Sequence, residues 1–206
     1  LDEFPEFSRA ALETLRQPLE EREVTVSRVE ASVTYPANFQ LVAAMNPCPC
    51  GHFPDRSRCR CTDGQITRYL QKVSGPMLDR IDICVEASPI TYGDIRSSGN
   101  NESSREIRAR VEQARKIQGE RFAGENIRCN GEMSGRHIRK FCWLGREEEK
   151  FMEEIFKKLA LSARMHDRIL KVARTTADLA EEEKIRLADL CEAVSYVKSR
   201  DKFWGN

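Results

Sequence analysis

The sequence predicts an α/β region followed by an all-α region. Alternating and continuous apolar runs, which are typical of β-strands, occur between residues 23 and 85. Beyond Ser104 apolar residues recur at helical spacing instead. Between these parts, Ser88 to Ser104 is rich in Ser, Gly, Asn and Pro, a composition typical of linkers. We therefore expect an α/β region over 1–89, a linker over 90–103 and a helical region over 104–206.

The α/β region begins with a predicted helix and a predicted hairpin. Ser8 is placed to cap a helix that carries Leu12, Leu15 and Leu19 on one face. Pro18 falls inside that pattern, so the helix should kink or end near it. Apolar residues then alternate with polar ones over 23–35, which predicts a β-hairpin.

Two further strands are predicted in the same region. Residues 39–45 form a nearly continuous apolar run, which is typical of a strand buried on both faces, and Asn46-Pro47 ends it. Apolar residues at 66–73 suggest a short helix that stops at Ser74-Gly75-Pro76. Alternation at Ile81, Ile83 and Val85 suggests another strand.

The helical region carries four apolar stripes, enough to close a small bundle. The stripes are Ile107, Val111, Ala114 and Ile117; Phe151, Ile155, Leu159 and Ala160; Ile169, Val172, Ala173 and Leu179; and Leu187, Leu190, Ala193, Val194 and Val197. We expect the aromatic residues Phe141, Trp143 and Phe151 to belong to the core of this bundle, and not to a platform for stacked bases.

Composition excludes some functional classes and leaves others open. No stretch of the 206 residues approaches the ~20 apolar residues of a membrane span, and no signal peptide opens the chain. The net charge of +1 combines −4 over 1–103 with +5 over 104–206, too mild a balance to require nucleic acid. Because the eight cysteines are unlike a secreted disulfide scaffold, we expect a cytoplasmic protein.

Four of the cysteines form a C-x-C-x₈-C-x-C pattern. They are Cys48, Cys50, Cys59 and Cys61. Four thiolates in one loop can hold a structural Zn²⁺, with His52 as a reserve ligand, although zinc knuckles usually space their cysteines by two residues. Two disulfides and free thiols are the alternatives, and a reducing compartment disfavours the disulfides.

Other polar residues suit nucleotide chemistry, each with a simpler alternative. Asp2 and Glu3 are an acidic pair of the kind that holds Mg²⁺ and orients water, or else a solvated turn. Asn46 ends an apolar strand where it can bind a water or a phosphate, or else it only begins an Asn-Pro turn.

Arginines add positive charge at two places. Arg80 suits a phosphoryl transition state, but a surface pair with Asp79 or Asp82 explains it as well. Arg164 opens a predicted helix, where an anion is favoured, although it also fits a solvated helix face. Both readings stay open on the residues alone.

Several segments, in the same order, resemble the magnesium-chelatase-like AAA+ ATPases, and among these the competence-associated bacterial branch. The similar segments are 1–7, 11–21, 35–37, 43–51, 74–82 and 162–175. The resemblance implies that residues 1–89 are the C-terminal part of an α/β AAA+ core, with a cysteine-cluster loop at 48–61. It also implies that 104–206 are an all-α helical lid.

The resemblance also implies roles for individual residues. Asp2 and Glu3 match the Walker B pair, so Asp2 would assist Mg²⁺ and Glu3 would activate water. Asn46 matches sensor 1, and Arg80 matches an arginine finger donated to the ATP of the neighbouring subunit. Arg164 matches sensor 2, with Arg168 and Arg174 as alternatives. Residues 23–35 match a pre-sensor hairpin, which points toward the pore or the substrate.

One departure from the family pattern is important. The phosphate-binding loop G-x-x-x-x-G-K-[ST] does not occur in the sequence. We therefore expect a piece of a longer protein, which alone neither binds ATP tightly nor hydrolyses it.

The functional hypothesis is a part of a ring-forming ATPase, with a hexamer of identical subunits expected, that remodels DNA during competence or recombination. Arg136, His137, Arg139 and Lys140 form a basic patch that suits DNA or a solvated helix face equally. A zinc-stabilised adaptor without ATP chemistry and the ATPase subunit of a metal-inserting chelatase are the alternatives.

Overall fold

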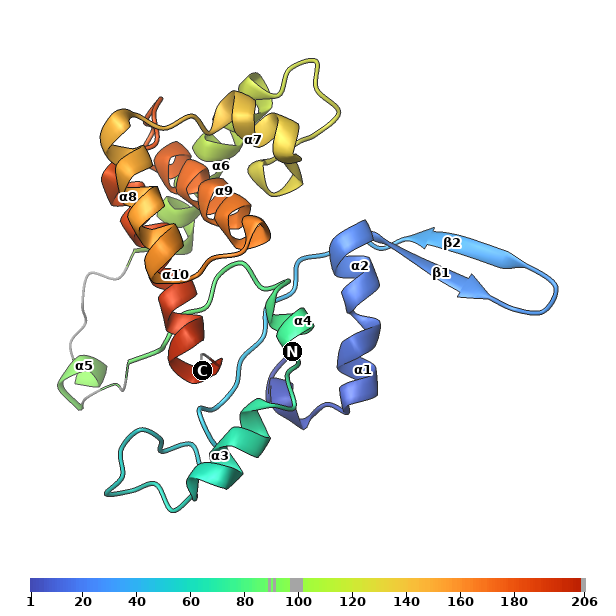
Figure 1. Ribbon diagram of the computed structural model, residues 1–206, viewed down its shortest axis with the longest axis vertical. Coiled ribbons are helices and arrows are strands. Elements are labelled where there is room, and N and C mark those ends of the chain that lie inside the picture. The colour runs from blue at the N-terminus through green and yellow to red at the C-terminus, as the bar shows by residue number, and fades with distance from the viewer. Residues whose placement is uncertain (89, 91, 97–101, 205–206) are drawn as a thin grey trace. The chain divides into compact units, whose positions relative to one another are not determined.

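The computed structural model describes residues 1–88, 90, 92–96 and 102–204, whose helices and strands are labelled in Figure 1. They form two compact units. The first contains Leu1–Ile83 and the chain from Arg200 onward, and the second contains Cys84–Ser199. The predicted linker over 90–103 contains the short helix α5 (Tyr92–Arg96), while 91 and 97–101 lie outside the described residues.

The first unit opens with a short 3-10 turn, η1 (Phe4–Glu6), and two short helices, α1 (Arg9–Thr14) and α2 (Arg16–Glu21). The Ser8 hydroxyl caps α1 as predicted, because it accepts a hydrogen bond from the Ala11 N–H at 3.2 Å. The helix is interrupted at Leu15. The predicted kink or end of the helix near Pro18 is therefore confirmed. It is expected there because Pro18 has no N–H to donate to the carbonyl four residues earlier.

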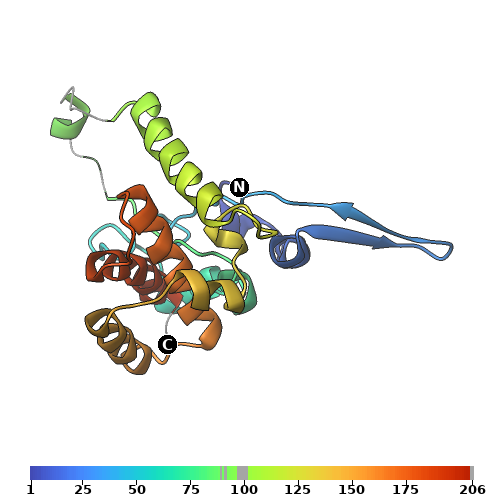
Figure 2. The same cartoon turned by 90° about the horizontal axis from the view of Figure 1, so that it is seen from above.

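The predicted hairpin is confirmed. Strand β1 (Glu23–Ser27) pairs antiparallel with β2 (Ser32–Pro36), and Glu23 lies opposite Pro36. Thr25 and Thr34 hydrogen-bond across the pair at 3.0 Å. Almost every residue of the two strands is exposed, and Figures 1 and 2 show the hairpin extending away from α2.

The predicted strands at 39–45 and 81–85 are not formed as regular strands, since both segments are extended chain outside any assigned sheet. The expectation that 39–45 is buried on both faces is wrong: Phe39 is 44% exposed and Val42 is 71% exposed. Ile83 and Val85 are exposed as well. A strand requires neighbours for its backbone and its side chains, and the described residues do not supply them on both sides of these segments.

Two short helices complete the first unit, α3 (Asp63–Leu70) and α4 (Gly75–Leu78). Thr62 and Gln65 form a reciprocal capping box at the start of α3. Ser74 ends the preceding turn and also caps α4, accepting from the Met77 N–H at 3.3 Å. The buried side chains form two small clusters, one around Phe4, Leu12 and Met77 and the other around the cysteine loop.

The second unit is an all-α domain, as predicted. Its elements are α6 (Ser104–Arg121), η2 (Asn130–Glu132), α7 (Gly135–Phe141), α8 (Arg146–Lys158), α9 (Ala163–Leu179) and α10 (Leu187–Trp204). Sixteen buried residues from this unit form one continuous cluster. The last five residues of α10 lie in the first unit.

A buried polar network stabilises the second unit. The Asp178 carboxylate is fully buried and forms ion pairs with the guanidinium groups of Arg121 and Arg174. The Asn130 amide donates to it at 2.8 Å. Because a buried charge must be paired to be tolerated, each of these residues depends on the others inside the bundle.

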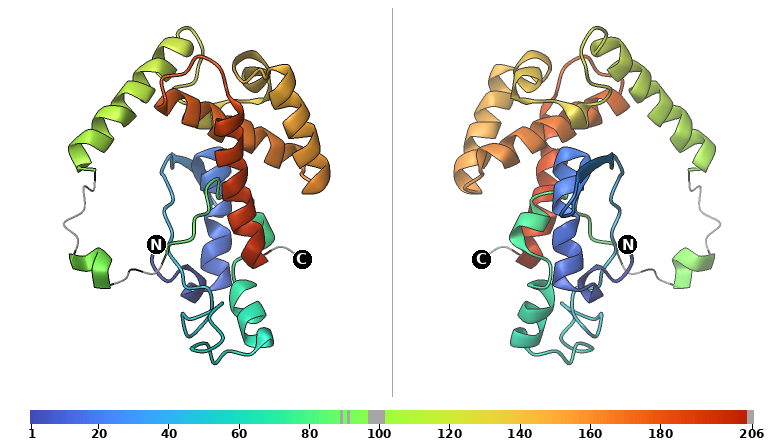
Figure 3. Two further views of the ribbon diagram at one scale, coloured as in Figure 1. Left: turned by 90° about the vertical axis from the view of Figure 1, so that its left-hand side faces the viewer. Right: turned by 90° about the vertical axis from the view of Figure 1, so that its right-hand side faces the viewer.

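Two expectations about the bundle need correction. In the first stripe only Ala114 is buried, whereas Ile107 and Val111 are 43% and 45% exposed, because the N-terminal half of α6 extends away from the other helices of its unit (Figures 2 and 3). Trp143 is not a core residue either, since 56% of it is exposed. Phe141 and Phe151 pack against the core as expected.

Candidate functional site

The start of the chain is hydrogen-bonded to residues 42–44 in a parallel register. The α-amino group of Leu1 donates to the Val42 carbonyl at 2.7 Å, and the Ala44 N–H donates to the Leu1 carbonyl at 2.9 Å. This alternation, with one residue bonded to two residues spaced by two on its neighbour, is the parallel β pattern. The carboxyl ends of both segments therefore point the same way.

The acidic pair lies directly at that end. Asp2 and Glu3 are both exposed, and the Asp2 carboxylate accepts a hydrogen bond from the Glu3 N–H at 2.9 Å. Glu3 has a left-handed backbone, with φ of 49° and ψ of 46°. A non-glycine residue in this region costs about 1–2 kcal/mol, and such residues cluster at functional sites.

Asn46 follows the other segment and is held by its surroundings. Its backbone N–H donates to the Tyr69 hydroxyl. Its side-chain amide lies next to Gly51, where an added Cβ would sit 3.7 Å from the amide oxygen. Burial raises the pKa of Tyr69, and the carboxylates of Glu6 and Glu3 raise it further. The Tyr69 hydroxyl is therefore close enough to interact with both acidic side chains and with Asn46.

Arg80 is bound within its own unit. It forms an ion pair with Glu20, donates from Nη1 to the Pro76 carbonyl at 2.6 Å and donates from Nε to the Arg16 carbonyl at 3.2 Å. Only 13% of its side chain is exposed. The simpler expectation, a pair with Asp79 or Asp82, therefore missed Glu20. In this state Arg80 joins the ends of α2 and α4.

The three sensor 2 candidates lie on α9 in the second unit. Arg164 is exposed in the first turn of the helix, where the Ser162 hydroxyl accepts from the Met165 N–H at 3.2 Å. Arg168 is half-buried one turn later. Arg174 is only 2% exposed and donates to Asp178 and to the carbonyls of Glu182 and Glu183. All of its donor nitrogens are therefore used inside the bundle.

The four cysteines of the loop converge to a single cluster. The Sγ atom of Cys48 lies 3.4 Å from that of Cys50 and 3.8 Å from that of Cys59, and Cys50 and Cys59 are 3.6 Å apart. All four Sγ atoms, including that of Cys61, lie within 4.8 Å of one another. A tetrahedral site with Zn–S bonds of about 2.3 Å requires S···S distances of about 3.8 Å, so the cluster fits such an ion.

Backbone groups support the cluster from outside. The Phe53 N–H donates to the Cys48 Sγ at 3.4 Å. The N–H groups of His52 and Arg60 lower the pKa of Cys50 to about 6, while burial raises the pKa of Cys61 to about 11. The His52 backbone N–H therefore supports the cluster. Its side chain is not part of the group of possible metal ligands that the described residues form.

The cysteine loop is also packed against the rest of the first unit. Cys48 and Cys59 belong to a buried cluster with Ile66, Tyr69 and Leu70 of α3. Trp204, at the end of α10, packs against this cluster and donates from its indole N–H to the Leu70 carbonyl at 3.0 Å. Because Cys48 is two residues after Asn46, whatever fixes the cysteines also fixes the backbone beyond Asn46.

Two residues of the predicted basic patch form ion pairs within the protein. Arg136 and Lys140 both contact the Glu125 carboxylate, at 3.1 and 2.7 Å. His137 is buried and accepts a hydrogen bond from the Ser134 N–H at 3.1 Å. Of the predicted patch, Arg139 borders the cleft described next.

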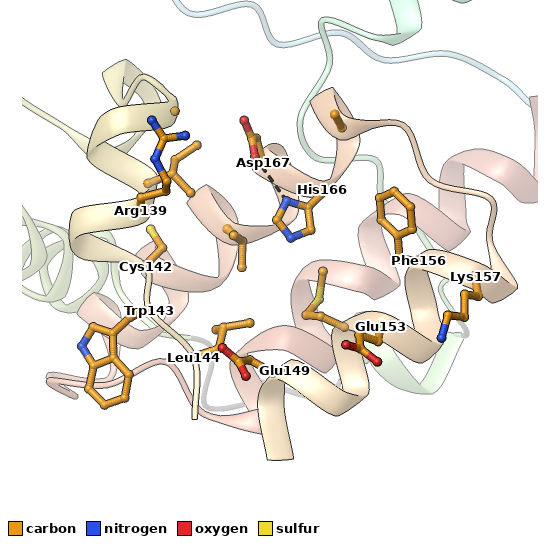
Figure 4. A pocket seen from close by; sticks show the side chains of 15 residues that line it. Arg139, Cys142, Trp143, Leu144, Glu149, Glu153, Phe156, Lys157, His166 and Asp167 are labelled. Carbon is orange, nitrogen blue, oxygen red and sulfur yellow. Dashed lines mark hydrogen bonds and ion pairs between the residues drawn. The ribbon is translucent and has the colours of Figure 1, made fainter. Parts of the chain in front are cut away.

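An open cleft of about 970 Å³ lies between α7, α8 and the start of α9 (Figure 4). Trp143 and Phe156, both exposed, border it, and His166 contacts Asp167 at 3.2 Å on its wall. The Lys184 ammonium lies 5.4 Å from the centre of the Trp143 ring. The sequence pattern does not predict this cleft, because it places Trp143 in the core of the bundle.

No helix in the described part of the chain combines the length and apolar character that a membrane span requires.

The chain matches models of known protein families over most of its length. Residues 1–95 match the family model described as magnesium chelatase, subunit ChlI, and residues 101–197 match the model described as its C-terminal part.

Curated relatives cover 95% of this chain. The competence protein ComM of Haemophilus influenzae is 44% identical over 197 residues, and the uncharacterised protein YifB of Escherichia coli is 44% identical over 198 residues. The uncharacterised protein Rv2897c of Mycobacterium tuberculosis is 37% identical over 196 residues. The chain spans only 38–39% of the length of these relatives. It belongs to the magnesium-chelatase-like family.

Proposed function

We propose that this chain is the C-terminal part of a ring-forming AAA+ ATPase that uses ATP hydrolysis to remodel DNA. The observation that carries the proposal is the parallel hydrogen bonding between Leu1 and residues 42–44, which directs Asp2, Glu3 and Asn46 to one end of two neighbouring segments. Ligands of α/β sheets bind at this carboxyl end. The link to DNA comes from the name of one relative, a competence protein.

Each residue has a defined task in the proposed site. Bound Mg²⁺ would neutralise charge on the phosphates, with Asp2 assisting its coordination. Glu3 would accept a proton from the attacking water, and the Asn46 amide would hold that water in line. Arg164 would contact the nucleotide from the lid of the same subunit. Arg80 would leave Glu20 and reach the nucleotide of a neighbouring subunit in a ring, which we take to be a hexamer.

The chain by itself should be inactive. Its sequence contains no G-x-x-x-x-G-K-[ST] loop to cradle the phosphates. Further chain fits against residues 39–45, because the exposed apolar side chains of Phe39 and Val42 would be covered by it. We therefore assign ATP hydrolysis to a longer cytoplasmic protein that supplies both features.

The decisive experiment measures DNA-stimulated ATP hydrolysis by that longer protein. Arg80→Ala should abolish turnover if Arg80 acts on a neighbouring nucleotide. Glu20→Gln is the matched control, because it removes the same intramolecular ion pair but leaves the guanidinium available. Turnover that is lost equally in both variants would assign Arg80 to the fold instead of to catalysis.

We also propose that Cys48, Cys50, Cys59 and Cys61 hold one structural Zn²⁺. The support is the Sγ spacing together with the N–H donors that surround the cluster. With four protein ligands, no position remains for water, so the ion would stabilise the loop and do no chemistry. Elemental analysis of the purified chain should give one zinc per chain, and Cys50→Ser should lower this content while Cys191→Ser leaves it unchanged.

A zinc-stabilised adaptor without ATP chemistry is the second candidate. The observation in its favour is that the cysteine cluster is complete within this chain, whereas the phosphate-binding loop is not. A longer protein that binds DNA but hydrolyses no ATP would support the adaptor and exclude the motor.

A further inference from the structure

The outer face of α6 carries cations that the fold does not use. Arg105, Arg108, Arg115 and Lys116 are exposed, and among the described residues none of them has an ion-pair or hydrogen-bond partner from a side chain. At 100° per residue, Arg105 and Lys116 lie opposite the buried Ala114. Arg108 and Arg115 lie about 120° and 100° from Ala114, on one flank of the same outer side.

Some other arginines of the same unit are neutralised by carboxylates. Arg110 pairs with Glu102 at 2.7 Å, Arg121 with Asp178, and Arg186 with Glu182 at 2.8 Å. Three arginines of this unit therefore have carboxylate partners, whereas the four cations on the outer side of α6 have none among the described residues. Exposed pairs contribute little to stability, but unpaired cations gathered on one face repel each other in the free protein.

The charge of α6 differs from that of a helix of similar exposure in the same unit. Helix α6 carries six Lys and Arg against three Glu, a net charge of +3, whereas α8 carries four Lys and Arg against five Glu, a net charge of −1. Glu112 and Glu120 also lie on the outer side of α6, so the four free cations leave a net charge of +2 there.

The geometry suits an extended polyanion. From Arg105 to Lys116 the helix rises about 16 Å at 1.5 Å per residue, which is about the length of five base pairs at 3.4 Å each. Three of the four cations are arginines, whose planar groups bind phosphate through two hydrogen bonds. The N-terminal half of α6 extends away from the other helices of its unit, so neighbouring elements of that unit leave it accessible (Figure 3).

A membrane surface fits this helix less well. An interfacial helix needs a broad apolar face with aromatic or leucine residues. The large apolar side chains exposed on α6 are those of Ile107 and Val111, and the same stripe is buried at Ala114. The outer face of α6 therefore suits a charged partner better than the apolar interior of a membrane.

We propose that the outer face of α6 binds the phosphate backbone of nucleic acid through Arg105, Arg108, Arg115 and Lys116. This assignment rests on the proposed function, since it names the surface that contacts the DNA substrate. The contact is independent of base sequence, because the side chains that make it are all phosphate-binding cations.

The test measures binding of the 206-residue chain to a short DNA duplex of arbitrary sequence over a series of salt concentrations. Replacing all four cations by alanine should weaken binding on the order of tenfold or more at low salt, and it should reduce the slope of log affinity against log salt by about 3 to 4. The matched control replaces Arg146, Lys150, Lys157 and Lys158 of α8, which removes the same number of cations from the same unit, and it should retain most of the binding.

The outcomes separate this inference from the proposed function. Equal loss in the α6 and α8 variants, no binding by the unmodified chain, or binding to anionic vesicles in preference to the duplex would each overturn the inference. In the longer protein, the α6 variant should retain basal ATP hydrolysis and lose its stimulation by DNA. Binding through α6 without any stimulated hydrolysis would uphold the inference and contradict the proposed function.

Discussion

The two units of this chain differ in how their buried apolar residues are grouped. The helical unit has one continuous cluster of sixteen buried residues and a paired polar network around Asp178. The first unit has two smaller clusters of five buried residues each, and exposed apolar side chains occur in both units. Because apolar burial is the main stabilising term, the helical unit should be stable by itself, and the first unit should depend on a metal ion and on additional chain.

The largest expected effect is the removal of metal from the first unit. A strong chelator should abolish the thermal transition of that unit and leave the helical transition in place, because the cysteine cluster anchors α3 and the chain beyond Asn46. Calorimetry would resolve the two transitions. A chelator that leaves both transitions unchanged, on a sample shown to contain zinc, would contradict the dependence.

Breaking the buried network should be the largest single change in the helical unit. Asp178→Ala leaves the charges of Arg121 and Arg174 without their shared partner, which we expect to destabilise the unit by about 3–5 kcal/mol. Urea denaturation followed by circular dichroism would measure the loss. Glu153→Ala, an exposed carboxylate on α8, is the control and should change stability by less than about 0.5 kcal/mol.

A substitution at the end of α10 tests where the boundary between the units lies. Trp204 is half-buried and, among the described residues, packs against the two first-unit clusters. Trp204→Ala should therefore destabilise the first unit by about 2–3 kcal/mol and spare the helical unit. Trp204→Phe retains most of the packing but loses the bond to the Leu70 carbonyl, so it should cost about 1 kcal/mol. If Trp204→Ala destabilised only the helical unit, the end of α10 would belong to that unit and not to the first.

The smallest expected effect is a pH dependence within the helical unit. Hydrogen bonding to Lys140 lowers the pKa of Glu125 from its ordinary value of 4.5, so the pair stabilises the folded unit at neutral pH. This contribution should disappear as the pH falls through and below 4.5, because protons then bind the carboxylate. Glu125→Gln should lower the melting temperature slightly at pH 7 and flatten its decline in acid. An unchanged acid profile would exclude the pair as a source of stability.

Local patterns predicted the elements whose partners are close in sequence. The alternation at 23–35 predicted a hairpin, and the cysteine spacing predicted the cluster that the loop forms. Strands at 39–45 and 81–85 could not be judged in this way, since a strand depends on neighbours that the sequence pattern does not identify. The same limit applies to Arg80, whose partner Glu20 lies sixty residues earlier, and to Trp143, whose surroundings come from α8 and α9.

The central claim is that Glu3 and Arg80 serve one nucleotide from two different subunits. In the longer protein, Glu3→Gln and Arg80→Ala should each be inactive alone, because each lacks one half of every site. When the two variants are mixed and allowed to exchange subunits, hydrolysis should return, since intact Glu3 then meets intact Arg80 at some interfaces. A mixture as inactive as its components, with subunit exchange shown independently, would contradict a site shared between subunits.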